Sequence, residues 1–114
     1  MELLKERIRR EGKVLPGNII KVDGFLNHRV DTKLLEALAD EFAKYFDISK
    51  ITMVLTAEAS GIALATICAQ KYGVPMLFAK KAKSDNIEGG LYQSEVFSYT
   101  YKKKVTLIVS HEWL

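Results

Sequence analysis

The chain has 114 residues, of which 48% are hydrophobic and 27% charged, and its formal net charge is +3. This length suits one small domain, the composition excludes disorder over most of the chain, and the mild charge fits either an anionic ligand or a solvated surface. A single cysteine excludes an intramolecular disulfide, and no apolar run approaches the ~20 residues that span a bilayer, so we expect a cytoplasmic protein without a membrane partner.

The first thirty residues contain short elements separated by turn signals. Residues 2–11 carry apolar side chains at helical spacing among charges, and Gly12 follows as a stop, which predicts a short amphipathic helix. Residues 14–17 predict a brief strand that turns at proline and glycine, and residues 18–23 predict a second one. Residues 24–30 are expected to form an irregular connection.

The strongest helical pattern covers residues 32–46, with Asp31 as its N-cap. Its apolar face comprises six side chains, which are Leu34, Leu35, Leu38, Phe42, Tyr45 and Phe46. Because such a face must be buried, we expect it to pack against a sheet.

A strand, a helix and a second strand follow. Residues 51–56 form a nearly continuous apolar run, typical of a strand buried on both faces. A helix of small residues is predicted over residues 62–72 with Gly73 as its stop, and residues 75–79 predict another buried strand. This order predicts a βαβ unit with parallel strands and a right-handed crossover.

The last third of the chain changes character. Residues 81–90 are polar and basic and end in glycine, which predicts a mobile loop. Residues 91–101 alternate between the two faces of a strand, and residues 105–110 predict a further strand joined to it through Lys102 and Lys103 as a β-hairpin. One crossover helix and two central strands leave much of the sheet uncovered, so we expect further chain after Leu114.

The turn Glu58–Gly61 is the first candidate site. It lies at the carboxyl end of a predicted strand and opens a helix, where open α/β sheets bind ligands and where backbone N–H groups attract anions. Ser60 adds a hydroxyl group, and Gly61 allows close approach. The alternative is a plain strand-to-helix turn in which Ser60 is the N-cap.

Lysines follow the next predicted strand, at positions Lys80, Lys81 and Lys83. In a parallel sheet they would lie beside the turn, which favours a phosphate site, although a solvated basic turn has the same composition. Asn27 is a second candidate, because an amide both donates and accepts hydrogen bonds and so suits the edge of a flat heterocycle. A turn asparagine that bonds to its own backbone is the alternative. Two histidines and one cysteine, far apart, give no support for a zinc site.

Taken together, four segments resemble the xanthine phosphoribosyltransferase family. Residues 21–28 (Lys-Val-Asp-Gly-Phe-Leu-Asn-His) resemble its amino-terminal signature, and residues 58–62 resemble its pyrophosphate loop. Residues 73–81 resemble the strand and basic turn that follow, and residues 96–100 the flexible hairpin. The likeness covers essentially the whole chain, as the amino-terminal part of such an enzyme.

The resemblance implies an α/β fold with a phosphoribosyltransferase-type parallel sheet, an amino-terminal hood and a flexible β-hairpin, truncated before the domain is complete. Residues 1–114 would be a single, incomplete domain, in which residues 1–30 form the hood segment and residues 31–114 a partial core with the hairpin. A homodimer is implied as well, and no nucleic-acid partner.

The implied reaction is purine salvage, in which xanthine and phosphoribosyl pyrophosphate give xanthosine monophosphate and pyrophosphate. Ile20 and Asn27 match positions that contact the purine, with Ile20 where leucine is usual. The positions implied for pyrophosphate are Glu58, Ala59, Ser60, Gly61, Lys80 and Lys81. Ala59 stands where serine is usual, which removes one hydroxyl. Mg²⁺ is implied as the cofactor, no residue of the chain is a metal ligand, and none is assigned as catalytic.

One family motif has no match in this sequence: an apolar strand that ends in two acidic residues, followed by a small-residue loop around the ribose phosphate. We therefore expect negligible transferase activity from this chain alone. The alternative function is a regulatory or ligand-sensing module of the same fold without catalysis, although no helix-turn-helix pattern precedes residue 51.

Overall fold

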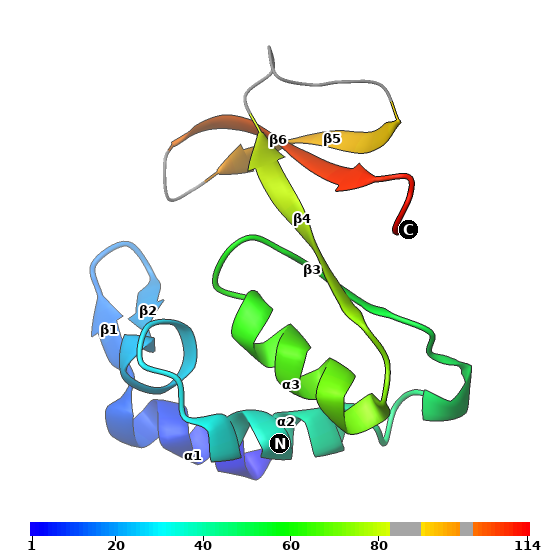
Figure 1. The fold of residues 1–114 in the computed structure, drawn as a ribbon. Helices are drawn as coiled ribbons and strands as arrows, with labels where there is room; N and C mark the ends of the chain where they lie inside the picture. The colour runs from blue at the N-terminus through cyan, green and yellow to red at the C-terminus, as the bar shows by residue number, and fades with distance from the viewer. Residues whose placement is uncertain (83–89, 99–101) are drawn as a thin grey trace.

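The computed structural model describes residues 1–82, 90–98 and 102–114. The helices are α1 (Glu2–Glu11), α2 (Thr32–Phe42) and α3 (Ile62–Tyr72), with a π-helical turn at Asp23–Asn27 and a 3₁₀ turn at Ile48–Lys50. The strands are β1 (Lys13–Leu15), β2 (Ile19–Lys21), β3 (Val54–Ala57), β4 (Met76–Ala82), β5 (Leu91–Ser98) and β6 (Lys103–Ser110). Figure 1 shows the helices at one end of the molecule and the β5–β6 hairpin at the other.

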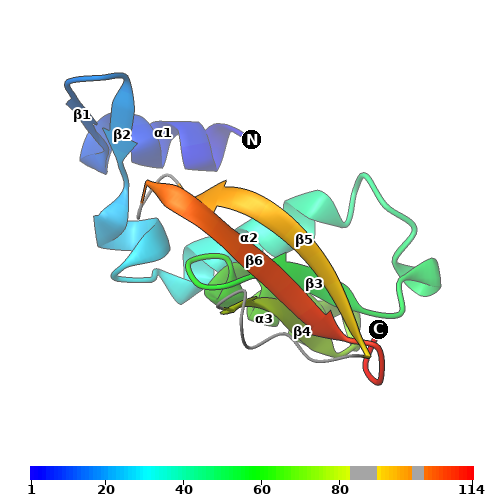
Figure 2. The ribbon, with the colours of Figure 1, turned by 90° about the horizontal axis from the view of Figure 1, so that it is seen from above.

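The larger sheet is mixed, with the strand order β3-β4-β6-β5. β3 and β4 are parallel and joined by α3, which confirms the predicted βαβ unit. β5 and β6 pair antiparallel as the predicted hairpin, and β6 also pairs with the end of β4, where Lys80 lies opposite Ile108. The parallel pair is therefore extended by an antiparallel one. Seen from above in Figure 2, the hairpin crosses over the β3–β4 pair.

β3 lies at the edge of this sheet, and the prediction of a strand buried on both faces is wrong, because none of its residues is fully buried and Leu55 is exposed. Its pairing runs only from Val54, opposite Met76, to Ala57, opposite Ala79. Leu55 is 52% exposed, so the face of β3 on which it lies is left open by the described residues. Beside it lies an apolar cavity of about 390 Å³, lined by side chains of β3, α3 and the segment between α2 and β3.

Helix α2 begins as predicted but ends early. The backbone N–H of Leu34 donates to Oδ1 of Asp31 at 3.1 Å, which confirms Asp31 as the N-cap. The helix ends at Phe42 rather than at residue 46, and Tyr45 and Phe46 in the turn that follows are exposed. Helical spacing alone therefore extended the predicted apolar face too far.

The apolar face of α2 packs mainly on other helices, so the prediction that it covers the sheet is wrong. The buried core consists of Phe25, Leu34, Leu35 and Leu38, and side chains of α1 and α3 pack around it. Phe25 comes from the π-helical turn, which replaces the irregular connection predicted for residues 24–30. Because this turn directs Phe25 inward, the amino-terminal segment and α2 share one core.

Helix α3 ends at Gly73, whose φ of +70° lies in the left-handed region that glycine adopts without strain. This confirms the predicted stop. Near the end of the helix, the hydroxyl of Tyr72 donates to the carbonyl of Ala39 at 2.6 Å, and Lys71 pairs with Asp40 at 2.9 Å. These contacts fix α3 against α2.

Part of the predicted mobile loop belongs to β4, which includes Lys81 and Ala82. The rest of that prediction, residues 83–89, lies outside the described residues, as does the predicted end of the hairpin strand at residues 99–101. Within residues 1–82, 90–98 and 102–114, no helix has the length and apolar character needed to cross a membrane.

Candidate functional site

The turn Glu58–Gly61 joins β3 to α3 at the carboxyl end of β3, which is the position predicted for it. The backbone N–H of Glu58 donates to the carbonyl of Ala79 at 2.9 Å, so the turn begins as a continuation of the β3–β4 ladder. The Glu58–Ala59 peptide bond is cis, and the N–H of Ile62 donates to the carbonyl of Ala59 at 3.2 Å.

Ser60 does not cap α3. The N-cap residue is Gly61, which has no side chain to accept a hydrogen bond from the first turn of the helix, and Ser60 is exposed. The alternative in which Ser60 is the N-cap is therefore wrong. The N–H of Ile62 is bonded within the turn, but the next N–H groups of the first helical turn have no acceptor within the helix, so they can donate to an external oxygen.

Gly61 occupies a position with no room for a side chain. A Cβ atom there would lie 2.5 Å from Oγ1 of Thr56, well inside van der Waals contact. The φ of Gly61 is −77°, so the need for glycine comes from close packing and not from an unusual backbone conformation. Thr56 at the end of β3 thus sets how closely the helix start approaches the strand.

Two of the predicted lysines, Lys80 and Lys81, lie within β4, the strand that pairs with β3. Ala57, the last residue of β3, lies opposite Ala79 of β4. Lys80 and Lys81 are the next two residues of β4, so they lie beside the turn that follows Ala57. Lys80 is exposed, with Nζ 6.0 Å from the centroid of the Phe78 ring, and Lys81 is half-buried. The two predicted anion-binding segments are therefore neighbours in space, while Lys83 lies outside the described residues.

One hydrogen bond connects these two segments. The backbone N–H of Lys81 donates to Oε2 of Glu58 at 2.7 Å in a part-buried position. Sequence reasoning placed Glu58 in the turn but gave no sign of this contact, because the side chain reaches across to a residue 23 positions away. An acidic residue directly after a strand is the one local signal that could have suggested it.

The predicted purine contacts lie in the amino-terminal segment. Ile20 is the middle residue of β2, opposite Val14, and is 57% exposed. Asn27 is the last residue of the π-helical turn and is also exposed. Figure 1 shows the β1–β2 hairpin and the β3–α3 turn on the same side of the helices. The predicted purine-binding residues and the predicted pyrophosphate-binding residues thus lie on separate elements, on the same side of the helices.

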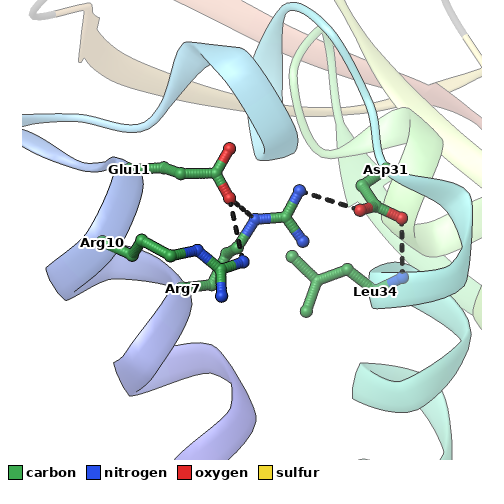
Figure 3. A network of polar contacts seen from close by, with 5 residues as sticks. All are labelled: Arg7, Arg10, Glu11, Asp31 and Leu34. Carbon is green, nitrogen blue, oxygen red and sulfur yellow. Dashed lines mark hydrogen bonds and ion pairs between the residues drawn. The ribbon is translucent and has the colours of Figure 1, made fainter.

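Arg7 holds this segment to α2, as Figure 3 shows. Its Nη2 lies 2.9 Å from Oδ2 of Asp31, its Nε pairs with Glu11, and its guanidinium lies 5.2 Å from the centroid of the Phe25 ring. The hydrogen bond from Leu34 N–H, followed by that from Arg7, lowers the pKa of Asp31 below its usual value. Because Asp31 and Phe25 are distant from Arg7 in sequence, sequence reasoning missed these two contacts.

The described residues include no side-chain cluster of the kind that holds metal ions in proteins. Among them, no group of three or more histidine, cysteine, aspartate or glutamate side chains lies close enough to hold a metal ion. The carboxylate of Glu58, within the candidate turn, accepts a hydrogen bond from the protein's own backbone.

Known proteins give the family context. No family model matches the chain. It is 50% identical over 114 residues to the xanthine phosphoribosyltransferase of Lachnoclostridium phytofermentans, covering 100% of this chain and 59% of that protein. It is 52% identical over 112 residues to the one from Lactobacillus delbrueckii subsp. bulgaricus, covering 98% and 58%. The chain thus spans about three-fifths of the length of these curated relatives.

Solved structures show the same fold at low sequence identity. The adenine phosphoribosyltransferase of Giardia lamblia, solved with 9-deazaadenine, matches with a TM-score of 0.68 and 23% identity, over 94% of this chain and 59% of that one. The adenine phosphoribosyltransferase of Saccharomyces cerevisiae matches with a TM-score of 0.67 and 15% identity, over 100% and 66%. The chain has the phosphoribosyltransferase fold and corresponds over its whole length to the amino-terminal portion of xanthine phosphoribosyltransferases.

Proposed function

We propose that this chain supplies the base-binding and pyrophosphate-binding parts of an enzyme that transfers phosphoribosyl from phosphoribosyl pyrophosphate to xanthine. The observation that carries the proposal is the register of β3 and β4, which brings the turn Glu58–Gly61 beside Lys80 and Lys81. The likeness to xanthine phosphoribosyltransferases at about half identity supports the same reading.

The pyrophosphate would be held by charge and by backbone donors. The uncapped start of α3 offers N–H groups, Ser60 offers a hydroxyl, and Lys80 and Lys81 offer positive charge on the adjoining strand. Negative charge grows on pyrophosphate as its bond to the ribose breaks. Donors that are already in place stabilise that charge without further reorganisation.

The base would be held by the amino-terminal segment. Ile20 presents an apolar side chain to one face of the purine, and Asn27 presents an amide to its polar edge. The shared core around Phe25 and the contacts of Arg7 keep this segment in place on α2. Discrimination between purines would then rest mainly on which ring atoms the Asn27 amide can pair with.

We further propose that this chain alone has negligible transferase activity. Phosphoribosyl transfer depends on holding base, ribose phosphate and leaving group together. Candidate residues for the base and the leaving group are present, but no segment of this sequence matches the ribose-phosphate motif. As the resemblance implies, we also propose that Mg²⁺ binds together with the pyrophosphate group, that the protein is cytoplasmic and that it forms a homodimer.

Calorimetric titration with xanthine and with guanine tests the base site. We expect xanthine to bind more tightly than guanine, and Asn27→Ala to weaken xanthine binding by about tenfold or more, because unmaking a hydrogen bond to a ligand amide group costs about 1–3 kcal/mol. Gln70→Ala removes an exposed amide from the opposite end of α3 and is the matched control, expected to leave binding unchanged. Equal binding of the two purines, or no binding, would contradict the proposal.

A further inference from the structure

We propose that Glu58 is a positioning residue, whose carboxylate holds the turn Glu58–Gly61 against β4 and does not itself contact pyrophosphate. This refines the prediction that Glu58 is a pyrophosphate ligand, and it rests on the proposed function of that turn. The basis is the hydrogen bond from Lys81 N–H to Oε2 of Glu58 at 2.7 Å.

The bond lies where β4 changes partners. β3 pairs with β4 as far as Ala57 opposite Ala79, and Glu58 N–H donates to the carbonyl of Ala79. Beyond that point β4 continues on its other edge with β6, where Lys81 lies opposite Leu107. Alternate residues of a strand direct their backbone groups to the same edge, so Lys81 N–H faces the side that β3 has left. The Glu58 side chain takes the place of the missing backbone acceptor.

This use of the carboxylate also has an electrostatic consequence. A carboxylate aimed at a bound pyrophosphate would repel it, whereas Glu58 directs at least one oxygen to a backbone N–H of the neighbouring strand. A hydrogen bond to an ionised acceptor is stronger than one between neutral groups. Together with the bond from Glu58 N–H to the carbonyl of Ala79, this contact therefore helps to set the distance between the helix-start donors and the two lysines.

The same contact connects the turn to the hairpin. β4 pairs with β6 from Lys80 to Ala82, and β6 pairs along its length with β5. A displacement of the turn relative to Lys81 would therefore shift it relative to the whole hairpin. The helix-start N–H groups and the two lysines must keep a fixed distance to bind one anion together. Loss of the Glu58 acceptor therefore lowers the affinity for the anion, although no contact with the anion is removed.

Two variants separate this role from direct contact. Glu58→Gln keeps a carbonyl acceptor for Lys81 N–H but removes the charge, and Glu58→Ala removes both. Glu36→Ala, which removes an exposed glutamate from α2, is the matched control. Amide hydrogen exchange at Lys81, followed by NMR, measures the stability of the hydrogen bond to Glu58. Calorimetric titration with inorganic pyrophosphate, with and without Mg²⁺, measures the affinity of the proposed pyrophosphate site.

In Glu58→Ala we expect Lys81 exchange to accelerate and pyrophosphate affinity to fall, each by about tenfold or more, as for an unmade bond to a charged group. Glu58→Gln should restore most of both, and Glu36→Ala should change neither. Unchanged Lys81 exchange in Glu58→Ala would overturn the proposal. So would tighter pyrophosphate binding by both Glu58 variants, which indicates simple repulsion, or a loss in Glu58→Gln confined to Mg²⁺, which indicates a metal ligand.

The outcomes also separate this inference from the proposed function. If the unaltered chain binds pyrophosphate and Glu58→Ala binds it equally well, the positioning role is wrong and the pyrophosphate site stands. If the unaltered chain does not bind pyrophosphate at all, the proposed function of the turn is wrong and the positioning role is lost with it, whatever the exchange rate at Lys81.

Discussion

The helical part of the molecule (α1, the π-helical turn, α2 and α3) and the four-stranded sheet differ in how deeply their side chains are buried. Among the described residues, every buried apolar side chain but one belongs to the helical part, and the exception is Ala79 on β4. Sheet residues such as Leu55 and Tyr92 are more than half exposed. The helical part therefore has a core of its own, whereas the sheet contributes little to burial.

This difference bears directly on the candidate site. The start of α3 belongs to the well-buried part, and Lys80 and Lys81 belong to the exposed sheet. The bond from Lys81 to Glu58 crosses between them. The candidate pyrophosphate site is thus assembled at the boundary between the more and less firmly packed parts. Of the candidate base residues, Asn27 belongs to the helical part, whereas Ile20 lies on the exposed strand β2.

The largest expected effect is at Phe25, which is fully buried. Phe25→Ala should lower the free energy of unfolding by about 3–5 kcal/mol, because it leaves a cavity in the helical core. Leu55→Ala, in the half-exposed sheet, should cost about 1 kcal/mol or less. Urea unfolding followed by circular dichroism measures both. Equal losses for the two variants would remove the distinction between the two parts.

A smaller effect is expected at Gly61, where an added Cβ would meet Thr56 of β3. Gly61→Ala should cost about 1–3 kcal/mol of unfolding free energy, because the new Cβ overlaps Oγ1 of Thr56. Adding Thr56→Ala should recover part of the loss, and Gly24→Ala, where a Cβ would meet nothing within 4 Å, is the control. A double variant no more stable than Gly61→Ala would show that the contact is not the cause.

Tyr72 tests the packing of α3 on α2. Tyr72→Phe should cost about 1–2 kcal/mol, since the carbonyl of Ala39 loses its donor. Burial raises the pKa of Tyr72 from its usual 10.0 to about 12. The contribution of the protonated Tyr72 hydroxyl to the free energy of unfolding is therefore fully present below pH 10 and is lost as the pH rises toward 12. Thermal unfolding between these pH values should show a steeper fall for the unaltered chain than for Tyr72→Phe, and parallel curves would contradict this assignment.

The smallest effect is expected at Asp31, where solvent screens the charges. Its pKa is lowered, first by Leu34 N–H and then by Arg7, so its contribution is present above the usual value of 3.8 and is lost as the pH falls. Asp31→Asn should lower the unfolding midpoint slightly at neutral pH and flatten its acid dependence. Arg7→Met, which removes one of the two partners, should flatten it less. If the unfolding midpoint of Asp31→Asn depended on acidic pH as that of the unaltered chain does, the Asp31 carboxylate would not be the source of this dependence.

Local signals predicted much of the fold. Asp31 and Gly73 mark helix ends through side-chain capping and a left-handed backbone, which depend only on nearby residues. The order of strand, helix and strand predicted the parallel pair. The edge position of β3 and the helical partner of α2 could not be predicted in this way, because both depend on which other elements pack beside them.

The candidate site was predictable to a similar extent. Composition and position pointed to the turn Glu58–Gly61 and to Lys80 and Lys81, and the parallel register places them together. The link from Glu58 to Lys81 and the pairing of Arg7 with Asp31 join residues 23 and 24 positions apart. Side-chain direction over such separations is decided by tertiary packing. The inward direction of Phe25 likewise follows from a π-helical turn, which has no distinctive sequence pattern.

In the proposed function, the turn Glu58–Gly61 binds pyrophosphate and the amino-terminal segment binds the base. Mapping of backbone amide chemical shifts by NMR, with pyrophosphate and xanthine added in separate titrations, tests it most directly. We expect pyrophosphate to shift the signals of Ser60, Gly61 and Lys80, and xanthine to shift those of Ile20 and Asn27. Shifts from both ligands in the same residues, or none in either set, would contradict it.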